Sequence, residues 1–324
     1  MTVTASGALL VTPERGAAVM APPIAQDWPP PQLWHGHSLN GWPLAVWLAS
    51  GFGDVLQAAR YIRPLLRWAQ HDAPVHFLTY RAVAPLLRYN FPTASILTER
   101  PVPKVRWIFD GAIPFAPRSL WPFAAQDVGL FRRLFGPALA PYLRAPAPRR
   151  LRDDGLQVGI RWAANDRGRS IPDPALLAPL WSVPGVYWHS LQAEPEHPPP
   201  HPMVADHRAE LADWSDTANL VSGLDLVLAV DTAVAHLAGA LGVPTWMLLL
   251  PRPKGGDGRS TTRVADPRWC RPLYRTARPF YQSTPDAWHE PIHRAAARLR
   301  RLLAVHPHKE CRPTIHPGVE EAHV

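Results

Sequence analysis

The fold of this chain is indicated by residues 226–249, which read LVLAVDTAVAHLAGALGVPTWMLL. The apolar run at 226–230 predicts a strand covered on both faces, as in a parallel sheet flanked by helices. Small residues dominate 232–241, which predicts a helix thin enough for another element to pack close to it. After Pro244, the apolar run at 245–249 predicts the next strand. This strand–helix–strand pattern is typical of a parallel α/β sheet.

The same alternation occurs on both sides of a Pro/Arg-rich segment at 144–153, RAPAPRRLRD. We expect further strands at 44–49, 75–79, 105–109, 156–162 and 186–191, and further helices at 55–69, 217–223 and about 286–303. The pattern predicts two α/β units, at 32–148 and 149–304, with the ligand site in the cleft between them. Residues 1–31 predict a flexible Pro-rich leader, and residues 305–324 a disordered tail.

Length and charge narrow the class of protein. At roughly 100–200 residues per domain, 324 residues make about two domains. The chain has 34 Lys and Arg against 26 Asp and Glu, for a net charge of +8, and nearly all the bases are arginines. Because arginine forms paired hydrogen bonds with phosphate and carboxylate groups, an anionic ligand or surface is favoured. The base content of the genome explains an arginine-rich chain equally well.

Cysteine content and hydropathy point to the compartment. Cys270 and Cys311 cannot build a disulfide framework or a four-thiolate zinc site, which excludes a small secreted disulfide protein. The N-terminus lacks a basic start followed by a sustained apolar block. The longest apolar stretch, 224–250, is interrupted by charged residues and a proline. We therefore expect a cytoplasmic protein, with peripheral contact to the inner membrane face left open by its positive charge.

A glycine loop, Gly51-Phe52-Gly53-Asp54, lies between the first strand and its helix. Glycines let the backbone approach a ligand, and a helix N-terminus offers N–H groups and a partial positive charge. Asp54 is a candidate catalytic group, although an aspartate here also serves as a helix cap worth about 1 kcal/mol. A GxGxxG fingerprint is absent, which disfavours a nicotinamide enzyme.

A second group of candidates follows the strand at 226–230. Asp231 ends that strand, and Thr232 and Ala233 begin a helix whose first-turn amides can bind an anion. By helical spacing His236 shares a face with Ala233 and is directed toward whatever the helix start binds. A capping role for Asp231 and a half-buried structural role for His236 remain the alternatives.

A third group follows the strand at 156–162. Side chains suited to phosphate in this basic loop are those of Arg161, Asn165, Arg167 and Arg169. A solvated loop is the alternative interpretation. Gln192, at the end of the next strand, is placed to contact a base or ribose, or to face solvent.

Other kinds of site find little support. CxxC and GxSxG are absent, and many of the 15 histidines fall in Pro-rich loops or the tail without a metal-site frame, so no metal and no cofactor are expected. The bases are scattered and no RRM, KH or helix-turn-helix pattern occurs, so nucleic-acid binding is not expected.

Residues 231–249, DTAVAHLAGALGVPTWMLL, resemble the donor-site signature of GT-B glycosyltransferases related to lipopolysaccharide heptosyltransferases, glycosyltransferase family 9. The wider similarity is to the glycosyltransferase domain that follows tetratricopeptide repeats in bacterial proteins. It covers about residues 33–303, including 33–66, VGIRWAANDRGRSIP at 158–172, SLQ at 190–192, and 272–292.

The resemblance implies the α/β GT-B fold, in which two Rossmann-like domains face each other across a cleft. The first domain then takes the acceptor and the second the nucleotide sugar. Asp54 matches the general base of an inverting, metal-independent displacement at the anomeric carbon. Arg169 stands where heptosyltransferases carry a phosphate-binding lysine, and Gln192 where they place a residue that contacts the nucleoside. Residues that match the donor-binding motif are Asp231, Thr232, Ala233 and His236.

Two departures from the family concern loops. Ala49-Ser50 replaces the Glu-Gln usual before the glycine loop, and residues 252–267 are richer in glycine and charge than the corresponding family loop. We expect a hexosyl or heptosyl transferase that uses a nucleoside-diphosphate sugar and a glycan, lipid-linked or protein acceptor. The alternatives are a non-catalytic GT-B relative that binds a nucleotide or glycan for a partner, a nucleotide-sugar epimerase using Glu194, Glu196 or Glu210, and a nucleic-acid-binding protein.

Overall fold

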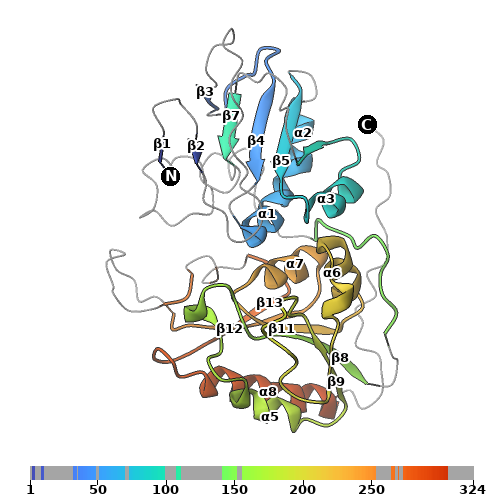
Figure 1. Ribbon diagram of the computed structural model, residues 1–324, viewed down its shortest axis with the longest axis vertical. Coiled ribbons are helices and arrows are strands. Elements are labelled where there is room, and N and C mark those ends of the chain that lie inside the picture. Colours follow the sequence, from blue (N-terminus) through green and yellow to red (C-terminus); the bar gives the residue numbers. More distant parts are fainter. Residues whose placement is uncertain are drawn as a thin grey trace.

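The computed structural model describes residues 2–3, 9–10, 32–34, 36–48, 51–69, 73–98, 107–110, 141–151, 155–252, 264–266, 269 and 273–305. These residues form two α/β units that follow one another along the longest axis of the molecule (Figure 1). Each unit is built on a sheet whose strands all run parallel, as the alternation of apolar runs and helical patterns predicts.

The first unit contains a five-stranded sheet in the order β3-β7-β4-β5-β6. Its strands are β3 (Gln32–Leu33), β4 (Leu44–Leu48), β5 (Val75–Thr79), β6 (Ser95–Leu97) and β7 (Trp107–Asp110). Its helices are α1 (Phe52–Ala58), α2 (Ile62–Ala69) and α3 (Ala84–Asn90). A 3₁₀ turn at Ala59–Tyr61 joins α1 to α2, so the predicted helix at 55–69 is continuous helical chain with one tightened turn.

The second unit contains a six-stranded sheet in the order β10-β9-β8-β11-β12-β13. Its strands are β8 (Leu156–Arg161), β9 (Val186–Ser190), β10 (Val204–Ala205), β11 (Leu226–Val230), β12 (Thr245–Leu249) and β13 (Ala277–Tyr281). Counted along the chain this is the order 3-2-1-4-5-6 of the Rossmann fold. Because the order reverses between β8 and β11, the loops after these strands diverge and leave a crevice at the carboxyl edge of the sheet.

Helices cover both faces of this second sheet. Helices α6 (Trp214–Val221) and α7 (Ala233–Leu241) lie on the side of the first unit, and α5 (Ala178–Trp181) and α8 (His289–Val305) on the far side (Figure 1). Burial on both sides explains why the side chains of β11 and β12 are apolar and buried throughout.

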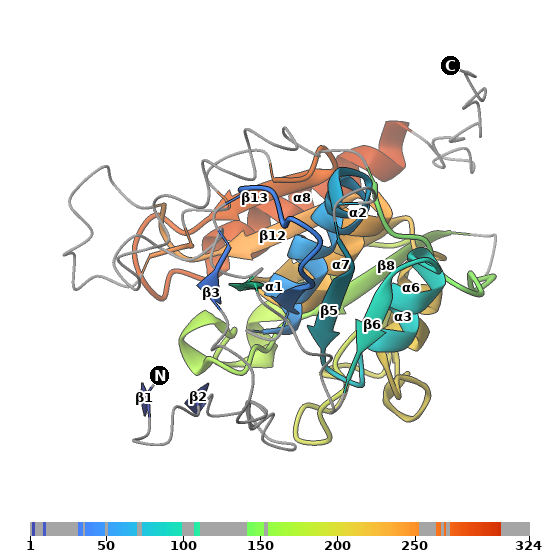
Figure 2. The same ribbon diagram turned by 90° about the horizontal axis from the view of Figure 1, so that it is seen from above.

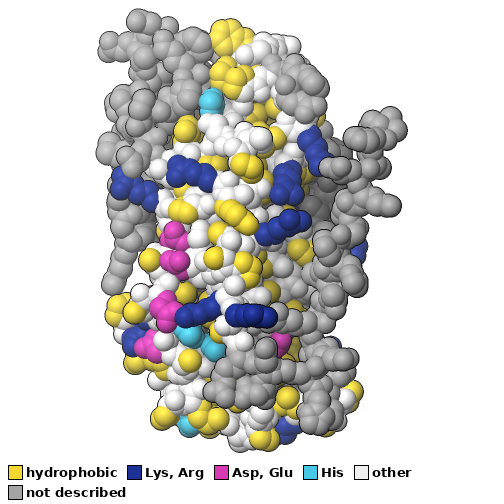
Figure 3. Space-filling view, turned by 90° about the vertical axis from the view of Figure 1, so that its right-hand side faces the viewer, with side chains coloured by type: hydrophobic (Ala, Val, Ile, Leu, Met, Phe, Trp, Pro, Cys, Tyr) yellow, Lys and Arg dark blue, Asp and Glu magenta, His cyan; other side chains and the backbone are white. Residues whose placement is uncertain are grey.

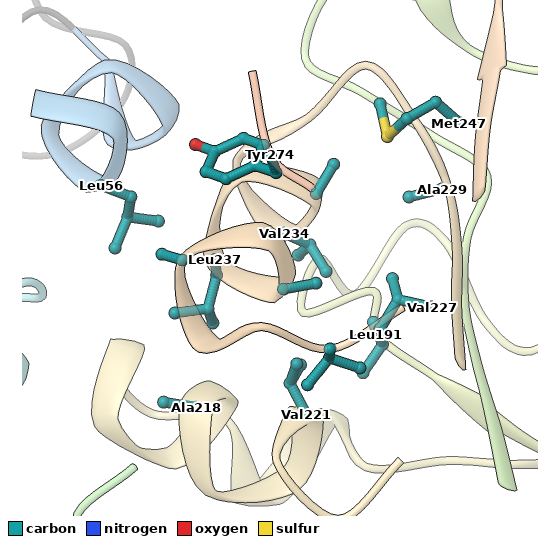
Figure 4. Packing of buried hydrophobic residues seen from close by; sticks show 14 of the residues in the cluster. Leu56, Leu191, Ala218, Val221, Val227, Ala229, Val234, Leu237, Met247 and Tyr274 are labelled. Atoms are coloured by element: carbon teal, nitrogen blue, oxygen red, sulfur yellow. The ribbon is translucent and has the colours of Figure 1, made fainter. Parts of the chain in front are cut away.

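The two units meet where α1 crosses α7 (Figure 2). Leu56 of α1 projects toward Leu237 of α7, and both side chains are fully buried (Figure 4). The connecting segment also binds α7, because the backbone N–H groups of Tyr142 and Leu143 both donate to the carbonyl of Ala240. A further backbone hydrogen bond of 3.0 Å joins Trp214 of α6 to the carbonyl of Ala82.

At the two ends of the chain the structure differs from the expectations, and several expected features lie outside the described residues. Within the predicted leader, Thr2–Val3 (β1) and Leu9–Leu10 (β2) pair as antiparallel strands, where composition predicts irregular chain. Val305 belongs to α8 rather than to the tail. Positions outside the description include 49–50, 253–263, 306–324, Cys270 and Cys311. Among the described residues, no helix combines the length and the apolar character needed to span a membrane.

Candidate functional site

Three loops converge at the carboxyl edge of the second sheet. They follow β8, β11 and β12, and together they surround a cavity of about 520 Å³. The residues that line it are Asp166, Gly168, Arg169, Asp231, Leu250, Val264 and Asp266. This is the crevice that the Rossmann strand order leaves open, and ligands of such sheets bind there.

Asp231 is the buried polar group of this cavity. Its Oδ1 accepts a hydrogen bond of 2.9 Å from the indole Nε1 of Trp269, and its Oδ2 lies 3.4 Å from Nη1 of Arg169. Arg169 also pairs through Nε with Oδ2 of Asp166 at 3.3 Å. The arginine expected to bind phosphate therefore lies between two carboxylates, but its side chain is 39% exposed and both contacts are long.

Helix α7 begins at the cavity with no side-chain cap. Thr232 is the N-cap residue, and its hydroxyl donates back to the carbonyl of Val230 at 3.2 Å instead of accepting from the helix. Ala233 and the cap residue are both half-buried at this end. The first-turn amides thus have the orientation that the sequence predicts for an anion site.

His236 lies in the second turn of α7 and is 2% exposed. Its Nδ1 is 3.0 Å from the hydroxyl of Tyr274, and its ring packs on that of Trp269 with centroids 4.8 Å apart. The opposite edge of the ring faces Gly53 of α1. A Cβ atom at Gly53 would come within 2.8 Å of Cδ2 and 3.5 Å of Nε2 of His236.

Asp54 lies in the first turn of α1, on the other side of this contact. Its Oδ2 is 3.3 Å from the point where a Cβ of Gly51 would be, so the carboxylate folds back over the start of its helix. Gly51 is the N-cap residue and offers no side chain to the helix. The structure therefore brings the glycine loop beside His236, and this placement of Asp54 suits both a cap and a base acting at the junction of the units.

Two of the predicted donor-site residues are engaged in internal contacts. Arg161 is 9% exposed and donates to the carbonyl of Leu191 at 3.0 Å and to Oε1 of Glu194 at 2.7 Å. Gln192 is fully buried, accepts from the amide of Ala163 and donates to Oε2 of Glu194. Arg161 and Gln192 thus share Glu194 as a partner at the strand ends. Their expected contacts with a donor stay predictions.

The remaining predicted residues lie on the loop after β8. Asn165 and Arg167 are exposed, and the 3₁₀ turn at Arg167–Arg169 is capped by Asp166, whose Oδ1 accepts from the amide of Gly168 at 2.8 Å. Their neighbours Asp166 and Gly168 line the cavity, whereas Asn165 and Arg167 do not. Their expected role in phosphate binding stays a prediction.

Sequence reasoning missed the aromatic residues that surround His236. They are Tyr274 and Trp269, which precede the last strand; Tyr142 of the connecting segment lies behind them, with its hydroxyl 3.5 Å from that of Tyr274. Arg60, 6% exposed, lies 5.1 Å from the ring of Tyr142 and 5.0 Å from that of Tyr274 and donates from Nε to the carbonyl of Gln57. The signal available in the sequence was the position of Arg60, four residues after Leu56 and so on the same face of the predicted helix.

A sequence spacing was also overlooked: residues 289–293 read HEPIH, the HExxH pattern of zinc-binding helices. In the structure His289 and His293 are exposed at the start of α8, away from α7. Glu290 accepts hydrogen bonds from the amide and the hydroxyl of Ser283 at 2.7 and 2.6 Å. Within the described part of the chain, no three His, Cys, Asp or Glu side chains are grouped to hold a metal ion.

Comparison with known proteins gives the class of fold. No family model matches the chain. Protein FlbA of Caulobacter vibrioides is 25% identical over 309 residues, which cover 84% of this chain and 48% of FlbA, so the chain spans about half the length of this curated relative. The iron-containing heptosyltransferase TibC of enterotoxigenic E. coli, solved with ADP-D-beta-D-heptose, aligns with a TM-score of 0.50 at 13% identity, over 64% of this chain and 58% of TibC. E. coli heptosyltransferase WaaC has a TM-score of 0.49 at 12% identity, over 81% of this chain and 99% of WaaC.

The likeness to TibC, together with the two parallel sheets, confirms the expected fold. The chain has the heptosyltransferase-like GT-B fold, with a Rossmann-ordered second unit. The resemblance to the repeat-linked domain in particular stays a prediction.

Proposed function

We propose that this protein is a glycosyltransferase that moves a sugar from a nucleoside-diphosphate sugar to a bacterial glycan, lipopolysaccharide or protein acceptor. The observation that carries the proposal is the meeting of the uncapped start of α7 with Arg169 at the Rossmann crevice, directly beside the loop of Asp54. TibC, which shares the fold, was solved with ADP-D-beta-D-heptose, and this supports a nucleotide sugar as donor.

In this proposal the donor diphosphate binds at the start of α7. The amides of the first turn and the guanidinium of Arg169 take the charge that develops on the leaving diphosphate as the bond from the anomeric carbon to the phosphate oxygen breaks. Asp54 accepts the proton of the acceptor hydroxyl, whose oxygen forms the new bond to the anomeric carbon with inversion. No metal is needed for these steps, because Arg169, His236 and the amides supply the electrophilic groups.

Binding of the donor requires Arg169 to exchange partners. Its contacts with Asp166 and Asp231 are 3.3 and 3.4 Å long. The pair with exposed Asp166 contributes on the order of 0–1 kcal/mol, and the pair with buried Asp231 is weakened by its length. A phosphate group offers shorter, charge-assisted hydrogen bonds. The exchange therefore costs little, and Asp231 keeps the hydrogen bond from Trp269 throughout.

A non-catalytic relative that binds a nucleotide or glycan for a partner is the second candidate function. The pairing of Arg161 and Gln192 with Glu194 favours it, because two side chains expected at the donor are already satisfied. This candidate predicts binding without turnover.

One experiment separates the two candidates. The purified protein is titrated calorimetrically with ADP, UDP, GDP and CMP at one salt concentration, and the sugar form of the nucleotide that binds is then incubated with protein to measure release of that nucleotide. Selective binding that His236→Ala removes and His293→Ala, an exposed histidine of α8, leaves intact supports a donor site. Turnover supports the transferase, binding without turnover supports the second candidate, and no binding to any nucleotide contradicts both.

Peripheral contact with an anionic membrane is proposed as part of the same function. Apart from Asp54, the described residues between 51 and 98 carry no carboxylate, whereas several arginines there and in the connecting segment are exposed. They are Arg63, Arg67, Arg81, Arg88 and Arg144. Figure 3 shows one side of the molecule, where dark blue side chains occur in the upper and the lower half and magenta side chains only from the middle downward.

Vesicle sedimentation tests this contact. Vesicles containing phosphatidylglycerol are expected to bind the protein at 0.1 M salt and to release it at 0.5 M, because exposed charges are screened over a shorter distance. Replacement of Arg63 and Arg67 by glutamate should weaken the binding. Equal binding to neutral phosphatidylcholine vesicles would contradict the proposal.

A further inference from the structure

The hydroxyl of Tyr274 contacts His236 at the junction of the two units, and its proton has a limited choice of acceptors. Tyr142 is 2.8 Å from the carbonyl oxygen of Leu56. A carbonyl only accepts, so Tyr142 donates its proton there and can offer Tyr274 only an acceptor oxygen. The proton of Tyr274 is left with two acceptors, the oxygen of Tyr142 and Nδ1 of His236.

Distance decides between these two acceptors. The oxygens of Tyr274 and Tyr142 are 3.5 Å apart, beyond the usual range of an O–H···O hydrogen bond, whereas Tyr274 is 3.0 Å from Nδ1 of His236. Burial raises the pKa of Tyr274 well above its usual range, so the hydroxyl keeps its proton. Tyr274 therefore donates to Nδ1, and a neutral imidazole then carries its own proton on Nε2.

The Nε2 edge of His236 faces the glycine loop. The missing side chain of Gly53 allows this approach, since a Cβ there would be 2.8 Å from Cδ2 and 3.5 Å from Nε2. Asp54 follows Gly53 directly and folds back over the same turn. An N–H group on Nε2 is thus presented where the donor-binding helix meets the candidate base, and not toward the interior of the second unit.

The ring of Tyr274 is itself held from the first unit. The guanidinium of Arg60 lies 5.0 Å from the Tyr274 ring centroid and 5.1 Å from that of Tyr142, and its Nη1 donates to the carbonyl of Leu273 at 3.4 Å. Gly239 leaves room for the ring to lie flat over α7. Figure 4 shows the hydroxyl of Tyr274 directed toward α1.

From these contacts we propose that Tyr274 is a positioning residue that holds His236 as the Nε2–H tautomer, aimed at the junction where sugar transfer takes place. The catalytic role of this N–H group rests on the proposed function, in which it donates to an oxygen of the leaving diphosphate. The tautomer itself follows from the contacts of Tyr274 and does not depend on that function. A fixed tautomer is known to matter in catalytic histidines, where its loss costs orders of magnitude in rate.

Nitrogen NMR of the imidazole groups tests the tautomer without any ligand. Long-range ¹H–¹⁵N spectra of the full chain distinguish Nε2–H, Nδ1–H and cationic rings, and His236→Gln assigns the signals of His236. We expect Nε2–H in the unmodified protein and in Tyr142→Phe. This variant loses the Tyr142 hydroxyl, which contacts Tyr274 but not His236. Tyr274→Phe keeps the ring and should show a mixture of tautomers.

Two results would overturn the proposal. One is an Nδ1–H or cationic His236 in the unmodified protein at pH 7.5. The other is a Tyr142→Phe protein whose His236 signals change as much as those of Tyr274→Phe, which would make the effect one of general packing.

Calorimetry then separates this inference from the proposed function. For the nucleotide that binds most tightly, Tyr274→Phe should raise Kd roughly tenfold, as expected for a hydrogen bond to a charged ligand that is no longer aligned, and Tyr142→Phe should raise it less than about twofold. Equal Kd values for the two variants contradict the positioning role. Absence of nucleotide binding in the unmodified protein contradicts the proposed function and leaves the tautomer result standing on its own.

Discussion

The two sides of the candidate site are built differently. On the side of α1, His236 is buried at 2% exposure and held by Tyr274, Trp269 and the backbone of Gly53. On the side of the cavity, Arg169 is 39% exposed and makes two long ion pairs. One side is therefore fixed before a ligand arrives, and the other can rearrange around it. A site of this kind orients the reacting groups without further ordering cost and still adapts to its donor.

The largest effect should come from the fixed side, at Asp54. Asp54→Asn keeps the size of the side chain and removes the base, so transfer should fall by about 10²–10⁴-fold. Nucleotide affinity should stay within about threefold, because the donor binds to the second unit. The measurement is the rate of transfer alongside the calorimetric Kd. If affinity fell as far as the rate, Asp54 would be a structural cap and not a base.

A second buried histidine, His189 of β9, contacts His207 outside the junction of the two units, and it tests whether fixed buried networks are confined to that junction. His189 on β9 is 3.0 Å from His207, 2.9 Å from Oε1 of Gln157, and 8% exposed. Burial, with added repulsion from His207 and Arg149, lowers the pKa of His189 to about 4. The folded state thus keeps this ring neutral while the unfolded chain takes up a proton near pH 6.5.

The sign of the resulting pH effect follows from this difference. Stability is complete above about pH 6.5 and decreases as the pH falls toward 4, by up to about 3 kcal/mol. Urea unfolding at pH 7.5, 5.5 and 4.5 measures the loss. His189→Gln should flatten this profile, whereas the exposed His293→Gln should leave it unchanged. An unaltered profile in His189→Gln would assign the loss to other groups.

The close approach of α1 and α7 can be broken with one methyl group. In Gly53→Ala the new Cβ would be 2.8 Å from Cδ2 of His236, so one helix must move, and we expect a loss of about 2 kcal/mol in the free energy of unfolding. Gly51→Ala is the control, because its φ of −156° suits alanine and its Cβ would lie 3.3 Å from Oδ2 of Asp54, with no backbone atom closer. It should cost under about 1 kcal/mol. Equal losses in urea unfolding would show that the helices are not in tight contact.

Local sequence patterns predicted part of the fold. Strands at 75–79, 226–230 and 245–249 agree with β5, β11 and β12. The apolar runs of β11 and β12 specify strands covered on both faces. Strand β13 was missed because Pro279 lies within it. Proline lacks an N–H group, and β13 tolerates it as the last strand in the order of the sheet.

For the candidate site, the sequence predicted the positions of single residues but not their contacts with distant segments. The sequence predicts a strand that ends at Asp231 and a helix that carries His236, and β11 and α7 have these positions. The roles of the two side chains stay predictions. The partners of His236 could not be predicted, because Gly53 and Tyr274 come from distant segments that only tertiary packing brings together. Polar residues at strand ends suggested ligand contacts for Arg161 and Gln192. The sequence offered no sign that Glu194 would bind both.

The smallest effect is expected on the adaptable side, at Arg169. Because its ion pairs are long and its own side chain is 39% exposed, Arg169→Ala should change the free energy of unfolding by less than about 1 kcal/mol. Nucleotide Kd should rise roughly tenfold, as one charge-assisted hydrogen bond to phosphate is lost. Arg169→Lys should recover most of the affinity, since the charge remains while the paired geometry is lost. Arg278→Ala, an exposed arginine on β13, controls for net charge. If Arg169→Ala instead destabilised the protein by 2 kcal/mol with no change in Kd, this arginine would be part of the fixed framework, and the contrast between the two sides of the site would not hold.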